Sequence, residues 1–284
     1  MKSIILIGIG LGLLVGCNQP QKEVRNEPVV SATISNPTNI VKLSSEIEYE
    51  KLNPARGDQS PQAGTIWGDR NGTEATGFLA KFVDGFSSPP HIHNITYRAV
   101  VIKGLIHNDD PNAEKMWMPS GSFWTQPQGE AHITAVKGEE NIALVEIDNG
   151  PYLVHSTEQA IDNGERPINI DVANVVWLNS NRSNWVSDES KAELSFLWES
   201  DQGKGLFLKL PAGFKGTINS EGTVFHAVVI QGELTYTLPQ GEEQKMLDPG
   251  SYFGATSNSV HSIQNHTELE TLVYIRTNAD FQVN

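Results

Sequence analysis

The sequence predicts an all-β protein built from two copies of one β unit, and two observations carry this prediction. Runs rich in Val, Ile, Thr, Phe and Tyr, such as 131–136 and 142–147, are separated every eight to twelve residues by Gly, Pro, Asn or Asp. This spacing is typical of a β-sandwich or barrel. Sliding the chain by 128 residues aligns 77–104 with 205–232, with nine identities in 28 positions and no gap, which indicates an internal repeat.

Composition narrows the class of protein. The chain has 284 residues, 38% of them hydrophobic, which supplies enough apolar material for one large or two modest domains. Its net charge of −14 argues against a nucleic-acid partner, because neutralising phosphates requires a surplus of Lys and Arg.

The N-terminus has the layout of a secretory signal. Residues 1–17, MKSIILIGIGLGLLVGC, place one Lys before an apolar run that is too short to span a bilayer comfortably. A buried N-terminal helix is the alternative. The small residues before Cys17 resemble the bacterial lipoprotein cleavage box, in which the cysteine thiol is lipidated. We therefore expect an exported protein anchored to a membrane through Cys17, at the periplasmic face of the outer membrane if the source is Gram-negative, because Asn18 follows rather than Asp.

The rest of the chain divides into three parts. Residues 18–40 are polar and contain Pro without a clear period, which predicts a flexible tether. The first β unit is expected over 41–160 and the second over 161–284. Cys17 is the only cysteine, so no internal disulfide can link these parts.

Three histidines in the first unit point to a metal site. Side chains alternate along an extended strand, so His91 and His93 converge on one side together with Tyr97. A third, His132, follows a Pro-Gln-Gly turn at 127–129 that would start another strand. Three neutral imidazoles on rigid strands can bind a transition metal and leave positions open for ligand. The alternative is that these histidines are structural residues of a barrel wall.

The spacing of these residues resembles the two motifs of the cupin superfamily. The first motif is matched by Gly85, His91, His93, Tyr97 and Gly104. The second is matched by Gly121, Pro127, Gly129, His132 and Val136. Every spacing is met, but Tyr97 stands where the family has a ligand Glu, and Val136 stands where it has Asn.

The resemblance implies two tandem cupin domains, which are jelly-roll β-barrels. Segments such as RGDQSP, SPPHIHN, YRAVVIKG and GSFWTQP look like an uncharacterised two-cupin family known only as a domain of unknown function. Its described relatives are the ChrR-type cupin and the acetylacetone-cleaving type of dioxygenase. The resemblance covers roughly 40–284 and indicates the fold better than the reaction.

The second unit is expected to be a degenerate cupin. At the 128-residue offset, Asn219, Glu221 and Phe225 replace the two histidines and the tyrosine of the first motif, while His261 is kept. We therefore expect one divalent transition metal per chain, iron or zinc.

Two classes of function follow from the resemblance. The first is a three-histidine Fe(II) dioxygenase acting on a small oxygen-donor substrate, with Tyr97 as a catalytic hydrogen-bond donor and Trp124 and Gln126 at the pocket mouth. The second is a non-catalytic ligand-binding or sensing lipoprotein with a zinc site. The expected partners are a small molecule and, through the lipid, a membrane. The sequence leaves open whether the chain forms a homodimer.

Overall fold

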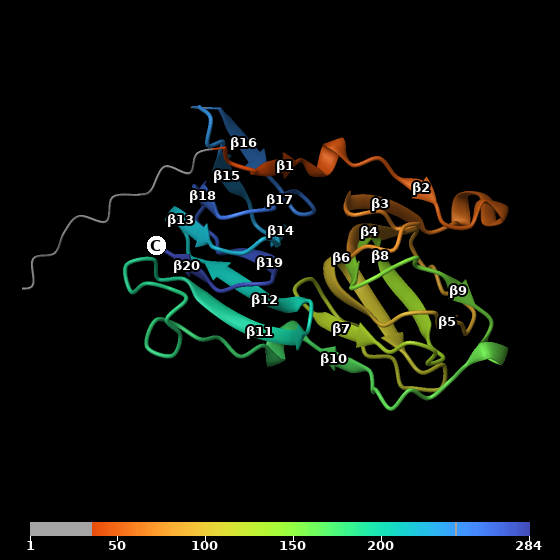
Figure 1. Cartoon of the computed structure of the whole chain (residues 1–284). Helices are drawn as coiled ribbons and strands as arrows, with labels where there is room; N and C mark the ends of the chain where they lie inside the picture. The colour runs from red at the N-terminus through yellow and green to blue at the C-terminus, as the bar shows by residue number, and fades with distance from the viewer. Residues whose placement is uncertain (1–35, 242) are drawn as a thin grey trace, which may run out of the picture. The chain divides into compact units, whose positions relative to one another are not determined.

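The structure is a computed structural model that describes residues 36–241 and 243–284 (Figure 1). The predicted signal, Cys17 and most of the predicted tether lie outside the described residues, so they stay predictions. Within the described part, no helix is both long enough and apolar enough to cross a membrane. Regular structure is almost entirely β, which confirms the predicted fold class. Among the described residues the exceptions are four short 3-10 helices: η1 (Ser44–Glu46), η2 (Pro54–Gln59), η3 (Thr157–Gln159) and η4 (Val172–Asn174).

The first copy is built on a seven-stranded antiparallel sheet. Its strands, in spatial order, are β10 (Ile168–Ile170), β7 (Phe123–Gln126), β6 (Tyr97–Asp109), β8 (Ile133–Ile147), β4 (Thr76–Phe82), β3 (Gln62–Trp67) and β2 (Glu50–Lys51). A separate two-stranded sheet pairs β5 (Ile92–His93) with β9 (Val154–His155). Strands β6 and β8 are long, and their pairing is irregular between Val101 and Leu105, where bulges let both strands bend.

The second copy is also built on two antiparallel sheets, with a different number of strands in each. Its six-stranded sheet has the order β1 (Ile40–Lys42), β17 (Tyr252–Ala255), β14 (Phe225–Gln231), β19 (Thr271–Thr277), β12 (Gly203–Leu210) and β11 (Glu193–Ser200). A five-stranded sheet has the order β16 (Gln244–Leu247), β15 (Leu234–Thr237), β18 (Ser259–Gln264), β13 (Lys215–Ser220) and β20 (Phe281–Val283). Tyr97 and Phe225, which the 128-residue offset aligns, occupy matching places, since Tyr97 is the first residue of β6 and Phe225 is the first residue of β14.

Alternating residues of β6 belong to two different cores, which explains its unbroken apolar run. Ala99 and Val101 pack inside the first copy with Phe78 and Val145. Val100 and Ile102 belong instead to a cluster that includes residues of the second copy, such as Tyr274. A stretch of strand that is buried on both faces is typically a near-continuous run of apolar residues.

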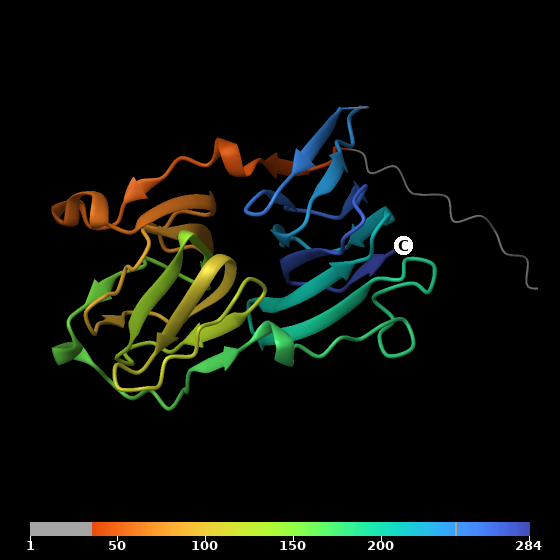
Figure 2. The same cartoon turned by 180° about the vertical axis from the view of Figure 1, so that it is seen from behind.

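Two strands cross the predicted domain boundaries (Figures 1 and 2). Strand β10 lies beyond residue 160, yet it pairs with β7 of the first copy. Strand β1 lies where the predicted tether meets the first unit, yet it pairs with β17 of the second copy. Just before β1, the Asn39 amide donates to the Tyr236 hydroxyl at 2.7 Å, so the end of the predicted tether is folded. Strands β1 and β10 thus each lie at the edge of a sheet and supply hydrogen-bond partners to the backbone of the neighbouring strand.

Candidate metal centre

His91 and His132 are held opposite each other by their backbones. The amide of each residue donates to the carbonyl of the other, and both hydrogen bonds measure 3.0 Å. Residues that exchange two hydrogen bonds across antiparallel segments place their side chains side by side. The two imidazole rings accordingly lie with their centroids 4.3 Å apart.

His93 completes the group from β5. Its ring centroid lies 5.1 Å from that of His91 and 5.2 Å from that of His132. Each of the three residues offers one nitrogen, and these nitrogens all lie within 4.8 Å of one another. The structure thus brings together the three histidines that the sequence proposed as ligands.

Backbone carbonyls fix the orientation of all three rings. The Nδ1 atom of His91 lies 3.0 Å from the Pro89 carbonyl oxygen. The corresponding distances are 3.2 Å from His93 to Leu153 and 3.2 Å from His132 to Glu130. Because a carbonyl can only accept, each Nδ1 carries the proton and each Nε2 keeps its lone pair. Backbone partners of this kind orient histidines that bind metals.

Burial keeps these imidazoles neutral. It lowers the pKa of His132 to about 3, with a further lowering from nearby His91. Burial, followed by the charges of His132 and His91, also holds the pKa of His93 well below its usual value. His91 is only half-buried, and burial lowers its pKa against the raising effect of the Pro89 carbonyl. At neutral pH all three therefore present a lone pair rather than a positive charge.

The turn before His132 needs its glycine. Gly129 has φ of +75°, and its amide donates to the His93 carbonyl at 2.9 Å, which connects the two motifs. A Cβ at this position would collide with the Ile161 side chain. The glycine at this motif position thus lets the turn before His132 pack closely against β5.

Tyr97 lies beside the histidines and is fully enclosed. Its hydroxyl oxygen is 3.4 Å from Nε2 of His132, and the hydroxyl donates to Oδ1 of Asn108 at 2.9 Å. The Trp124 indole donates to the same oxygen over a long 3.5 Å. Burial raises the Tyr97 pKa well above its usual value, so the phenol keeps its proton.

The structure corrects the expectation that Trp124 and Gln126 lie at the pocket mouth, since both are buried. Trp124 lines the inner wall of the cavity. Gln126 does not line it, because its side chain accepts from Asn108 at 2.8 Å and donates to the Glu130 carbonyl at 3.2 Å. A buried amide is held where its hydrogen bonds are met, and the strand pattern did not reveal those partners.

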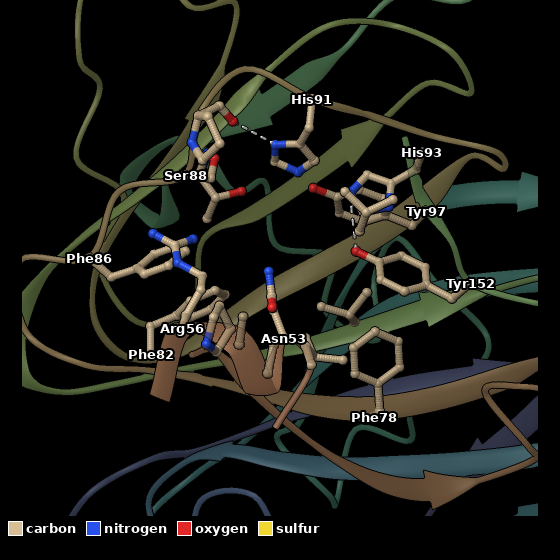
Figure 3. A pocket seen from close by; sticks show the side chains of 18 of the residues that line it. Asn53, Arg56, Phe78, Phe82, Phe86, Ser88, His91, His93, Tyr97 and Tyr152 are labelled. Carbon is tan, nitrogen blue, oxygen red and sulfur yellow. Dashed lines mark hydrogen bonds between the residues drawn. The ribbon is translucent and has the colours of Figure 1, made fainter. Parts of the chain in front are cut away.

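Tyr152 is a site residue that the sequence did not indicate. Its hydroxyl lies 3.3 Å from Nε2 of His93, and its ring stacks on the His93 ring at 4.5 Å between centroids (Figure 3). Asn94 fixes the segment that carries it, accepting from the Leu153 amide at 2.8 Å and donating to the Pro151 carbonyl at 2.9 Å. The only sequence signal is an Asn directly after the second histidine.

His91 and His93 border a cavity of about 290 Å³, and His132 lies beside them outside its lining. Figure 3 shows His91, His93, Tyr97 and Tyr152 among its labelled side chains. Apolar and aromatic side chains make most of the wall, and polar groups are few. The lining residues outside the histidines and tyrosines include Asn53, Arg56, Phe78, Phe82, Phe86, Ser88, Trp124, Thr134, Val145 and Val154.

The second copy offers no comparable centre. Its retained His261 stacks on Phe225 at 4.6 Å between centroids and bonds the Tyr236 hydroxyl through Nδ1 at 2.8 Å. Within 36–241 and 243–284, the three histidines of the first copy are the only group of His, Cys, Asp and Glu that meets the geometry of a metal site.

Comparison with known proteins supports this fold. The sequence model of the family described as "Domain of unknown function (DUF4437)" matches residues 40–284. No curated protein matches the chain.

Solved structures with a similar fold come from several kinds of protein. A proposed dioxygenase from Nostoc punctiforme is 15% identical with a TM-score of 0.66, over 86% of this chain and 84% of that one. Oxalate decarboxylase from Lactobacillus farciminis is 9% identical with a TM-score of 0.55, over 88% of each chain. A salicylate 1,2-dioxygenase variant from Pseudoaminobacter salicylatoxidans is 13% identical with a TM-score of 0.52, over 78% of this chain and 79% of that one. The predicted all-β cupin fold is confirmed.

Proposed function

The chain belongs to the DUF4437 family, and we propose that its first cupin barrel is the metal centre of a dioxygenase acting on a small oxygen-donor molecule. One observation carries the proposal. Three neutral histidines each have Nδ1 held by a backbone carbonyl, and their remaining nitrogens lie close together beside a largely apolar cavity.

The donor set fits a divalent transition metal. Imidazole nitrogens suit iron and zinc, and the three rings are neutral and already oriented. With Tyr97 in place of a carboxylate ligand, the protein adds no negative charge to the centre. An anionic oxygen donor therefore finds more attraction here than at a site that includes a ligand Glu.

Bound iron would supply a Lewis-acidic, redox-active position at which the substrate and O₂ meet. The chain itself does three things. Aromatic side chains such as Phe78 and Trp124 line the cavity with apolar surface. Tyr152 presents a hydroxyl whose proton can be donated to a ligand oxygen beside His93. Asn108 and Thr134 hold the Tyr97 ring in the wall.

Proteins of similar fold add support of limited weight. Two of them are named as dioxygenases, one by proposal and one as a salicylate 1,2-dioxygenase variant. An oxalate decarboxylase and vicilin from hazelnut also have a similar fold. Because one fold serves unlike functions, the site geometry rather than the fold carries the proposal.

The test is O₂ consumption by protein reconstituted with Fe(II), across a panel of β-diketones, hydroxy-ketones and α-hydroxy acids. We expect at least one compound to cause O₂ uptake in proportion to its own loss. The His91→Ala variant should lose this uptake. The His266→Ala variant should keep it, because His266 is an exposed residue of the second copy. It is the matched control, since it makes the same His-to-Ala change away from the site.

The opposite result would favour the second candidate function. If no compound causes O₂ uptake and none binds better than to metal-free protein, the oxygenase proposal is wrong. Zinc in protein isolated from its native compartment, together with ligand binding, would then identify a binding or sensing cupin. The cavity with its aromatic and apolar wall is the observation that favours this alternative.

A further inference from the structure

We infer that the ligand of this cavity is an aromatic carboxylate whose carboxylate group is bound by Arg56. The inference rests on the proposed function, because it concerns the same cavity. It adds a recognition site at the rim, and it names the class of molecule that the cavity accepts.

Charge within the cavity supports an anionic ligand. Among the described lining residues, Arg56 is the only one with a formal charge, since the histidines there are neutral. The chain as a whole carries a net charge of −14, so an unopposed cation at a cavity rim stands out. It would attract an anion to this place on an otherwise acidic protein.

The Arg56 guanidinium has no carboxylate partner. It makes no ion pair and no side-chain hydrogen bond with any residue that the structure describes. Of the six arginines within 36–284, four form ion pairs: Arg70, Arg98, Arg166 and Arg276. Arg56 and Arg182 do not; both are exposed, but only Arg56 lines a cavity.

The side chain is nevertheless held in place. Its guanidinium carbon lies 4.9 Å from the centre of the Phe86 ring, a cation–π distance. Figure 3 shows Arg56 beside Phe86 and Ser88, with Tyr97 and Tyr152 on the other side of the view. A guanidinium that packs its face on a ring still has its planar N–H edge free, and that edge matches a carboxylate.

The segment that presents Arg56 is braced at both ends. It belongs to η2, before which the Leu52 amide donates to the Pro61 carbonyl at 2.8 Å. The Asn53 amide donates to Oγ of Ser60 at 2.9 Å, which closes the same loop. The loop therefore fixes the place of Arg56 relative to the cavity wall.

The size and walls of the cavity indicate an aromatic body. A cavity of about 150 Å³ accommodates benzene, so the observed volume of about 290 Å³ suits roughly two fused rings. Phe78, Phe82 and Phe86 line it and offer faces and edges for ring stacking. A flat aromatic acid would thus place its rings among the phenylalanines and its carboxylate at the rim.

The test compares naphthalene-2-carboxylate with its uncharged carboxamide by calorimetric titration of the full chain. Both metal-free and zinc-loaded protein are used, because zinc does not support oxidation. We expect the acid to bind at least about tenfold more tightly than the amide, as for a charge-assisted hydrogen bond. Arg56→Gln should remove this preference and Arg56→Lys should keep part of it, while the matched control Arg182→Gln should leave it intact.

Three results would overturn the inference. They are equal binding of acid and amide to the unaltered protein, no binding of either, and a preference that survives Arg56→Gln. If that surviving preference appears only in zinc-loaded protein, the carboxylate binds the metal instead of Arg56. Metal content is measured on the same samples, so a failed metal site and a failed Arg56 site give different results.

Discussion

The hydroxyl of Tyr97 donates its proton to Oδ1 of Asn108 over 2.9 Å. Tyr97 stands at the motif position where a carboxylate ligand is expected. Asn108 also accepts from Thr134 at 2.8 Å and donates to Gln126 at 2.8 Å, so the tyrosine belongs to a satisfied buried network. Because a hydroxyl has one proton, Tyr97 can donate to a ligand only if it breaks its hydrogen bond to Asn108.

Replacing Tyr97 with Phe should therefore leave metal content unchanged. We expect the free energy of unfolding to fall by about 1 kcal/mol, the usual worth of one hydrogen bond, with a modest loss of turnover. Elemental analysis and denaturant unfolding measure the two quantities. Loss of the metal in this variant would show that Tyr97 is a ligand after all.

Replacing Tyr152 with Phe should lower turnover more than the change at Tyr97. The Tyr152 hydroxyl contacts Nε2 of His93 alone among described polar atoms, so its proton is available to a ligand. Losing a hydrogen bond to a charged oxygen costs about 1.5–3 kcal/mol, or about tenfold or more in rate. Steady-state kinetics of both variants decide the matter, and a larger loss at Tyr97 would contradict this assignment.

The ion pair between Glu146 and Arg276 should be important for stability. Both side chains are almost fully buried, and their Oε1 and Nη1 atoms are 3.5 Å apart. Burial raises the pKa of Glu146 in spite of Arg276. Arg276→Met would leave this carboxylate unpaired, and we expect a loss of about 3–5 kcal/mol in unfolding free energy.

Adding Glu146→Gln to that variant should recover part of the loss, because the unpaired charge is then removed. Asp148, whose Oδ1 lies 2.8 Å from Nη2 of Arg276, remains in both variants and limits the recovery. Denaturant unfolding of the two single variants and the double variant tests this cycle. A double variant no more stable than Arg276→Met would contradict the role given to Glu146.

Mild acid should destabilise the protein through buried histidines outside the metal centre. Burial lowers the pKa of His261 to about 3, and burial together with Arg276 lowers that of His226 to about 3. In the unfolded chain both protonate below about pH 6.5. The unfolded state then binds more protons than the folded state, so stability falls as pH decreases.

Between pH 7 and pH 5, each of these two histidines should remove about 2 kcal/mol of stability. Metal-free protein unfolded with denaturant at several pH values gives the slope. The His261→Gln variant should show a shallower slope over this interval, whatever its stability at pH 7. An unchanged slope would mean that His261 is already protonated in the folded protein.

Much of the fold could be predicted because its signals are local. The AVVI run of β6, the alternation of His91 and His93, and the motif glycines all follow from strand geometry and short turns. The repeat at 128 residues indicated two copies of one unit. These signals were enough to place the three histidines on converging strands.

The remaining features depend on contacts between distant parts of the chain. Tyr152 reaches His93 because Asn94 binds the backbone of the Pro151–Leu153 segment, and side-chain-to-backbone contacts leave no pattern in the sequence. Strands β1 and β10 join sheets of the other copy, which alternation cannot reveal. Gln126 turns away from the cavity because Asn108 is its partner.

The central claim is that His91, His93 and His132 together bind one transition metal. Elemental analysis of the purified full chain, after supplementation with iron and zinc, tests it most directly. We expect close to one metal ion per chain in the unaltered protein and in His266→Ala, and almost none in His91→Ala. A metal-free unaltered protein, or full occupancy in His91→Ala, would contradict the claim.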